Sequence, residues 1–344
     1  MLKIFKRIIK YVIQSQRALL KLSIIDILKN YDTNSENIVI INLLRGNYGI
    51  ELLCWDLSTV KYFTDNSIKF KISRGKKKLT NKKVFWSPSE KFFVNRENYS
   101  EKLIKYAQET ESISLINPNS YEVSYLENKV FMYRKFNELN IRTPKTKILF
   151  EQNQFEKEIH TFPVLLKGAH SSGSMDIFKI NKLDDLLEIA KSPKFIKKHK
   201  AFIIQELLNI RRDLRVVIIH GKIESYYWRI NHEKDWKPTS TSRGSSVDFQ
   251  NFPKEWEAFI LEEFNKLGVR MGAFDLAWDN DDLHTPPYIL EFSPRFTPNP
   301  PFLSNTKNNN YGERKRDTIG KDTYAINQVD LIFNLNSKYL NGCR

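Results

Sequence analysis

Apolar residues recur along this chain in two spacings, which predict an alternation of helices and strands. From residue 5 to residue 13 the apolar side chains follow a helical spacing with basic residues between them. The β-branched run 37–44 precedes Arg45 and Gly46, which predicts a buried strand and its turn. Segment 100–109 predicts a helix with Ser100 at its N-cap, and 112–117 predicts a further strand. The polar and basic segment 71–83 predicts a solvated loop or an edge hairpin. We therefore expect an α/β N-terminal domain over residues 1–118.

A second block, residues 119–335, opens with a helix. Its apolar positions from Val130 to Leu139 follow a helical spacing until Asn140 ends it. Lys129 stands at the start of this helix, where a cation is unfavourable for the helix dipole. This lysine is therefore either solvated or faces an anion. Thr143-Pro144 then forces extended backbone into the next segment.

An apolar strand in "FPVLLKGAHSSGSM" carries Lys167 directly into a loop of small residues. Glycine lets backbone N–H groups converge on a phosphate, and serine hydroxyls add donors with little bulk. The composition suits a movable phosphate flap, although a glycine-serine loop between strands is also an ordinary hairpin. No Gly-Lys-Ser/Thr closes the loop, so it differs from a P-loop.

Further strands are expected across 201–230, with two of them joined by the turn His220-Gly221. Arg215 and Arg229 lie on these neighbouring strands, where two guanidiniums repel each other unless an anion lies between them. The alternative is that they point to opposite faces of the sheet or into solvent. Farther on, Asp275 opens one strand-like run and Glu291 ends the next.

The composition of the chain argues against several classes of function. The chain has 344 residues, 41% of them hydrophobic, and 55 Lys+Arg against 40 Asp+Glu give a net charge of +15. The chain has two cysteines and six histidines, and it has no HExxH pattern. These counts argue against a zinc site of thiolates or histidines and against a disulfide framework. The lysine runs lack interleaved aromatic residues, so nucleic-acid recognition is not expected.

Residues 1–29 form a basic amphipathic segment. Its charges interrupt every apolar stretch long before the about 20 residues that a membrane span needs, and no export signal is recognised. We expect either a helix packed on its own domain or one that lies on a membrane surface. The location expected is cytoplasmic, with peripheral contact at the inner membrane face as the second alternative.

The motifs from Asn117 to Pro300 together resemble the ATP-grasp superfamily, in particular its ribosomal-protein glutamate ligase-like carboxylate-amine ligases. The resemblance rests on their order: "NK" at Lys129, "NIRTPKT", the loop after Lys167, "IIQELL" with "RDLRVVIIHGKI", Arg229, and the pair "FDLAWD" and "ILEFSP". It implies an α+β ATP-grasp fold of two subdomains that clasp ATP between antiparallel sheets, with a lid at about residues 145–206.

The resemblance also implies the roles of individual residues. Lys129 and Lys167 are expected to touch the ATP phosphates, under a flap that includes Gly168, Ser171, Ser172 and Gly173. The adenine-reading connector is Gln205, Glu206, Leu207 and Leu208, and Asp213 accepts from the ribose. Arg215 and Arg229 face the transferring group, whereas Arg243 is a weaker candidate near the acceptor.

Asp275 and Glu291 match the family positions that hold Mg2+, one or two ions, because this cation prefers carboxylate, phosphate and water oxygens. Relatives commonly carry asparagine two residues beyond the second acid. This chain has Ser293, whose shorter hydroxyl is expected to hold a metal loosely or through water.

The resemblance implies an ATP-dependent ligase that joins a carboxylate to an amine through an acyl phosphate. The acid and the amine are not defined by the sequence, although a basic surface suits an acidic glycan, a sugar derivative or a cell-surface peptide. Two alternatives stay open: an ATP-grasp small-molecule kinase, and a degenerate ATP-binding protein that binds an anionic polymer or membrane. The oligomeric state is likewise open.

Overall fold

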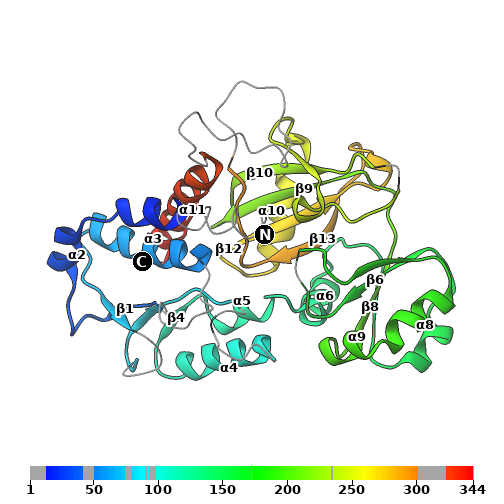
Figure 1. The fold of residues 1–344 in the computed structure, drawn as a ribbon, viewed down its shortest axis with the longest axis horizontal. Helices are drawn as coiled ribbons and strands as arrows, with labels where there is room; N and C mark the ends of the chain where they lie inside the picture. Colours follow the sequence, from blue (N-terminus) through cyan, green and yellow to red (C-terminus); the bar gives the residue numbers. More distant parts are fainter. Residues whose placement is uncertain are drawn as a thin grey trace. The chain divides into compact units, whose positions relative to one another are not determined.

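The computed structural model describes residues 13–41, 50–73, 79–89, 92, 98–171, 173–233, 235–300 and 323–343. These residues form two compact units, one with residues up to Leu126, 295–300 and the C-terminal helix, the other with Glu127–Pro294. Figure 1 shows the elements of both. The domain boundaries that the sequence predicts, at residues 118 and 335, stay predictions. The two compact units are defined by contacts between residues and do not test these boundaries. No helix in the described ranges is long and apolar enough to cross a membrane.

The N-terminal unit contains a parallel sheet of four strands in the order β2-β1-β3-β4. The strands are β1 (Asn37–Ile40), β2 (Lys71–Ser73), β3 (Lys83–Phe85) and β4 (Leu115–Asn117). The helices are a segment at 13–20, α2 (Ile24–Asn30), α3 (Ile50–Asp65), α4 (Tyr99–Glu111), α5 (Ser120–Ser124) and α11 (Thr323–Asn341). Buried β-branched residues of β1 and β3 pack against Leu103 and Tyr106 of α4, which fixes that helix on the sheet.

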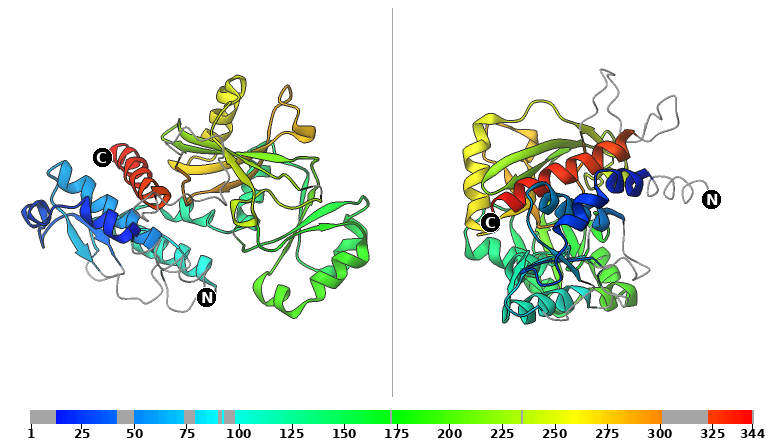
Figure 2. Two further views of the ribbon diagram at one scale, coloured as in Figure 1. Left: turned by 45° about the horizontal axis from the view of Figure 1, so that its top comes forward. Right: turned by 90° about the vertical axis from the view of Figure 1, so that its left-hand side faces the viewer.

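The C-terminal helix α11 lies along α3 within this unit, as both views of Figure 2 show. The buried amide of Asn336 donates to Ser58 Oγ at 2.7 Å and to Thr59 Oγ1 at 2.9 Å. Helix 13–20 joins them through Gln14, whose amide donates to Gln328 Oε1 at 2.7 Å. Buried polar groups need such partners, so these bonds define how the helices pack.

Two details of the predicted N-terminal elements are wrong. Helix α4 begins after Asn98, not after Ser100, and Asn98 has a left-handed backbone (φ 51°) without a side-chain cap bond. In segment 71–83, β2 and β3 flank β1 on opposite sides and run parallel to it, which contradicts the edge hairpin, whereas the described residues 79–82 form no strand, in line with the loop alternative. Pairing with the buried β1 stabilises strands that the local basic sequence does not indicate.

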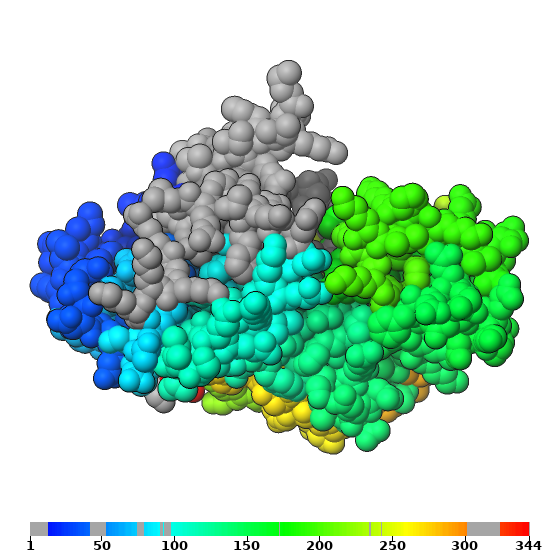
Figure 3. Space-filling model, turned by 90° about the horizontal axis from the view of Figure 1, so that it is seen from below, coloured from blue at the N-terminus to red at the C-terminus, as the bar shows by residue number. Residues whose placement is uncertain are grey.

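The second unit contains two antiparallel sheets. The lid sheet has the order β5-β8-β6-β7, and the larger sheet has the order β11-β10-β9-β12-β13. The lid comprises β5 (Thr146–Leu149), α7 (Phe155–Glu158), β6 (Val164–Gly168), β7 (Ile177–Ile180), α8 (Leu183–Lys191), α9 (Pro193–Lys198) and β8 (Phe202–Glu206). Its helices and sheet enclose a core that includes Phe155, Leu166 and Leu186, and Figure 3 shows α8 and α9 at the green surface.

The larger sheet comprises β9 (Arg212–Ile219), β10 (Lys222–Ile230), β11 (Ser246–Asp248), β12 (Met271–Ala277) and β13 (Tyr288–Ser293), with helices α6 (Lys129–Glu138) and α10 (Glu257–Lys266). Phe264 of α10 packs against Phe274 and Phe292, with ring centroids 5.5 and 6.0 Å away. Because side chains alternate along a strand, Asp275 and Glu291 must then point to the opposite face. The predicted fold class, an α/β domain followed in the sequence by two α+β subdomains with antiparallel sheets, is confirmed.

Candidate active site

The predicted carboxylates meet on a hairpin. Strands β12 and β13 are antiparallel, and Asp275 pairs directly with Glu291 in their register. A bulge follows, because Leu276 pairs with Ile289 and leaves Leu290 as the extra residue. Bulges near active sites re-aim side chains. Here the Leu290 carbonyl accepts the hydroxyl of Tyr133 at 2.9 Å, which ties α6 to this strand.

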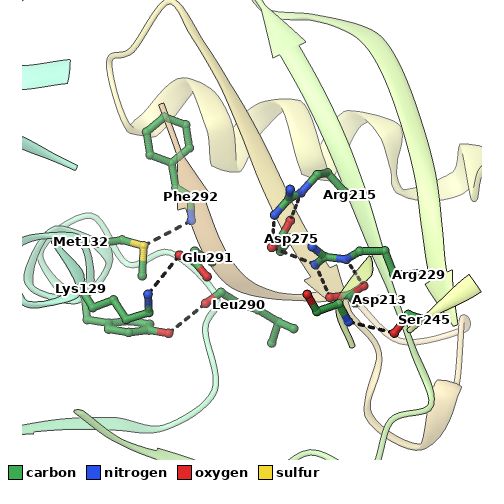
Figure 4. A network of polar contacts seen from close by, with 12 residues as sticks. Lys129, Met132, Asp213, Arg215, Arg229, Ser245, Asp275, Leu290, Glu291 and Phe292 are labelled. Atoms are coloured by element: carbon green, nitrogen blue, oxygen red, sulfur yellow. Dashed lines mark hydrogen bonds and ion pairs between the residues drawn. The ribbon is translucent and has the colours of Figure 1, made fainter. Parts of the chain in front are cut away.

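Asp275 lies between two guanidiniums, as Figure 4 shows. Arg215 donates Nε to Oδ1 at 2.6 Å and Nη2 to Oδ2 at 2.8 Å, and Arg229 Nη2 is 2.9 Å from Oδ2. Arg229 also forms a two-point ion pair with buried Asp213, with Nε 2.7 Å from Oδ1. The register of β9 and β10 places both arginines on one face, so the structure contradicts the alternative of opposite faces.

The two arginines also set the charge of Asp275. Burial by itself would raise the pKa of this carboxyl, but the guanidiniums of Arg215 and Arg229 outweigh it and hold the pKa below its usual range. Asp275 is therefore ionised throughout the physiological pH range. Glu291, more exposed than Asp275, forms an ion pair with Lys129 at 3.2 Å.

Both predicted lysines are buried and point into the same region. Lys129 is the first residue of α6, after the N-cap Asn128, and its Nζ donates to the Ser171 carbonyl at 2.7 Å. It therefore faces an anion, Glu291, rather than solvent. Lys167 Nζ donates a hydrogen bond to the hydroxyl of Tyr133 at 3.0 Å. Burial lowers the pKa of Lys167 to about 8, although Glu291 and Asp275 oppose this shift.

Tyr133 is a site residue that the sequence did not indicate. It lies one helical turn beyond Lys129 on α6, so both side chains share a face. The helical spacing of the apolar residues predicts for it only a place on the apolar face of the helix. Burial raises the pKa of Tyr133, which keeps its hydroxyl protonated as a donor to Leu290 while it accepts from Lys167.

Residues 168–176 connect β6 to β7 and are called the flap below. Its two ends are joined by the bond from Gly168 N to the Asp176 carbonyl at 2.9 Å. Gly173, Ser174 and Asp176 have left-handed backbones with φ between 56° and 62°. Ser171 is buried, and Ser172 lies outside the described residues. The exposed Arg243 reaches the flap and donates Nη2 to the Ser174 carbonyl at 2.8 Å.

A pocket lies between the lid and the larger sheet. Its lining includes the charged groups Lys167, Asp213, Arg229, Asp275 and Glu291. It also includes the apolar residues Leu165, Ile177 and Leu290 and the connector residues Gln205, Glu206, Leu207 and Leu208. Such a mixed lining suits a ligand with a flat apolar part and an anionic part. Lys129, Arg215, Gly168, Ser171, Gly173 and Ser293 are not among the lining residues.

The connector is held in place by its own contacts. The buried amide of Gln205 donates to Thr146 Oγ1 at 2.8 Å, and Glu206 accepts from the backbone of Lys145 at 3.2 Å. These bonds pair β8 with the strand β5, so the residues after Glu206 leave the sheet next to the pocket. The ribose role of Asp213 and the adenine role of the connector stay predictions.

The carboxylates fit a magnesium ion. No group of three or more His, Cys, Asp or Glu side chains in the described part of the chain could hold a metal by itself. Mg2+ does not require such a group, because one or two carboxylates with phosphates and waters complete its shell. Asp275 and Glu291 supply two oxygen donors from directly paired residues. Ser293 pairs with Ala273, two residues along the same strand.

Comparison with known proteins gives two similar sequences. The chain is 28% identical over 166 residues to coenzyme gamma-F420-2:alpha-L-glutamate ligase of Methanocaldococcus jannaschii, which covers 45% of this chain and 54% of that protein. It is 28% identical over 161 residues to the alpha-aminoadipate–LysW ligase LysX of Saccharolobus solfataricus, covering 45% and 58%. The chain thus spans about half the length of the curated relatives it matches. No protein-family model matches it.

Solved structures agree on the fold. D-alanine–D-alanine ligase from Bacillus anthracis matches with a TM-score of 0.51 at 12% identity, covering 89% of this chain and 97% of that chain. The strand order and this match show that the chain has the ATP-grasp fold. Its sequence resembles the ribosomal-protein glutamate ligase-like ligases, in line with the two ligases that it matches.

Proposed function

We propose that this protein is an ATP-dependent ligase that forms a C–N bond between a carboxylate and an amine and releases ADP and phosphate. The observation that carries the proposal is one pocket in which the paired Asp275 and Glu291 lie with Lys167 and Arg229. Similarity to two ligases supports the same activity. The pocket combines oxygen ligands for a cation with cations for phosphates, which phosphoryl transfer requires.

The chemistry starts from a poor electrophile. A carboxylate oxygen of the acid attacks the γ-phosphorus of ATP, the bond to the β-phosphate oxygen breaks, and ADP leaves. The resulting acyl phosphate is attacked by the amine at its carbonyl carbon, phosphate leaves with the bonding electrons, and the nitrogen loses a proton. Positioning and positive charge supply most of the rate enhancement in such transfers.

Each group of site residues has its own role in the proposed reaction. Lys129 and Lys167 hold the ATP phosphates beneath the flap, and the connector 205–208 reads adenine while Asp213 accepts from the ribose. Arg215 and Arg229 stabilise the transferring group, because their guanidiniums point to the face where Asp275 lies. Asp275 and Glu291 would hold Mg2+, with Ser293 as a weaker third position. The bound metal supplies charge neutralisation on the phosphate oxygens.

The net charge favours one class of substrate. The net charge of +15 favours an acidic partner, and we propose an acidic glycan, a sugar derivative or a surface peptide as the modified molecule. A panel of acids and amines tests this. ADP release that requires both an acid and an amine is expected, whereas ADP release with a stable phosphorylated acceptor supports the kinase alternative. Nucleotide binding without any turnover supports the degenerate alternative.

We also propose that the protein works in the cytoplasm, where ATP is available, and touches the inner membrane face through its N-terminal helices. Helix 13–20 packs on α11 through its polar side, since Arg17 and Lys21 both pair with Asp330 at 2.8 Å. Its other side and α2 expose an apolar patch: Leu19, Leu20, Ile24, Ile25 and Leu28, each 55–81% exposed. Clusters of exposed apolar side chains mark interaction sites. Lysines of residues 1–29 complement anionic lipid.

A further inference from the structure

The imidazole of His199 contacts both ends of the flap, although it takes no part in the chemistry proposed above. His199 follows α9 of the lid, and its side chain is fully buried, with 0% exposed. One face of its ring packs against Phe195, with ring centroids 4.5 Å apart. A buried imidazole with polar contacts on both nitrogens is a candidate for holding a neighbouring loop in place.

The two nitrogens of His199 serve opposite ends of the flap. The backbone N–H of His170 donates to Nδ1 at 3.2 Å, so this nitrogen carries no proton. The proton of the neutral ring then lies on Nε2, which donates to Asp176 Oδ2 at 3.2 Å. Lys198 contacts the same Asp176 oxygen at 2.5 Å and balances its charge. One side chain thus bridges His170, near the start of the flap, and Asp176, its last residue.

Gly168 makes room for this ring. A Cβ added at Gly168 would lie 2.4 Å from Nε2 and 2.5 Å from Cε1 of His199, well inside van der Waals contact. The glycine at this position therefore allows the imidazole to approach the backbone that directly follows Lys167. The backbone bond from Gly168 to Asp176 closes the same end of the flap at 2.9 Å.

We propose that His199 is a positioning residue that fixes both ends of the flap on the lid and so holds the flap backbone next to Lys167. The inference rests on the proposed function in one respect, that the flap and Lys167 receive the phosphates of ATP. The neutral ring is required, because a protonated Nδ1 would point a hydrogen at the N–H of His170. His199 touches neither the acid nor the amine in this assignment.

His199→Phe tests the inference, since it keeps an aromatic ring against Phe195 but removes both polar contacts. Hydrogen–deuterium exchange of peptides covering 168–176 is expected to become faster without ATP. The Kd for ATP is expected to rise about 5- to 30-fold, as the loss of one to two kcal/mol implies. His160→Phe, the same change at an exposed histidine of the lid, is expected to alter neither.

Flap exchange and ATP affinity that both equal those of the unmodified protein would overturn the role of His199. If His199→Phe does not fold by circular dichroism, His199→Gln provides the same comparison, because its amide can keep only one of the two contacts. An unmodified protein that binds no ATP would contradict the proposed function instead. The exchange comparison then still decides whether His199 holds the flap.

A second pair of variants separates packing from hydrogen bonding. Gly168→Ala is expected to lower the unfolding midpoint, because its Cβ meets the imidazole. Gly168→Ala combined with His199→Ala relieves that overlap, so the midpoint is expected to recover in part, while the flap exchange is expected to be fast because both polar contacts of His199 are lost. Recovery of slow flap exchange in the double variant would show that the ring acts only by filling space, and would overturn the inference.

Discussion

Asp275 has two roles in the site: its carboxylate forms ion pairs with two buried guanidiniums, and it lines the pocket. Arg215 and Arg229 both end on its carboxylate, and all three side chains are at least four-fifths buried. Two arginines on neighbouring strands repel each other without such an anion. The carboxylate that we propose as a metal ligand therefore also stabilises the strands β9, β10 and β12.

This double role predicts different outcomes for the two carboxylates. Asp275→Asn is expected to abolish ATP turnover and also to lower the free energy of unfolding by about 3 kcal/mol, because it leaves buried charge uncompensated. Glu291→Gln is expected to abolish turnover with a much smaller change in stability, since Glu291 is partly exposed. Urea unfolding followed by tryptophan fluorescence measures the free energy of unfolding of both variants. Equal loss of stability in the two variants would contradict this assignment.

His199 predicts a pH dependence of stability. Burial lowers its pKa from an ordinary 6.5 to about 4, although Asp176 opposes the shift. Between these values the unfolded chain binds the proton and the folded chain does not, so stability falls as the pH drops from 6.5 toward 4. Urea midpoints at pH 5.0, 6.0 and 7.5 should show a decline that is smaller in His199→Phe. An identical decline in both proteins would rule out this contribution.

At the scale of elements, local patterns indicated most of the strands and helices around the site. The helix after Lys129, the β9–β10 hairpin and the paired carboxylates of β12 and β13 all have clear local signals. The sequence did not indicate Tyr133 or His199, because their roles depend on contacts with residues 34 and 29 positions away. The predicted start of α4 was wrong, because no local sequence signal identifies Asn98 as the left-handed residue before the helix.

The hairpin that carries the carboxylates depends on a glycine. A Cβ at Gly272 of β12 would lie 2.1 Å from Phe292 Cε2 and 3.1 Å from the Ser293 carbonyl. Gly272→Ala is therefore expected to lower the free energy of unfolding by about 1–3 kcal/mol through overpacking. Adding Phe292→Leu removes the opposing ring atoms and should recover part of the loss. Differential scanning calorimetry measures the stability of the single and double variants. A Gly272→Ala variant as stable as the unmodified protein would contradict overpacking.

At the scale of the whole molecule, the charge and the exposed apolar patch predict membrane binding. Replacing Leu20, Ile24 and Leu28 by serine is expected to abolish co-sedimentation with vesicles that contain anionic lipid, and to leave ATP turnover unchanged. Serine at Ile113, Leu115 and Ile196, which are also exposed, provides the matched control and should have no effect. Sedimentation that is indifferent to anionic lipid, or to the first set of changes, would leave only the packed-helix interpretation.

The proposed activity depends on an acyl phosphate formed in the site, and hydroxylamine tests for this intermediate most directly. Hydroxylamine supplied in place of the amine should intercept the activated acid, so that a hydroxamate accumulates in step with ADP and phosphate. Glu291→Gln should abolish all three products, whereas Glu262→Gln, at an exposed carboxylate on α10, should leave them unchanged. Accumulation of AMP and pyrophosphate would contradict the mechanism, because these products arise from an acyl adenylate.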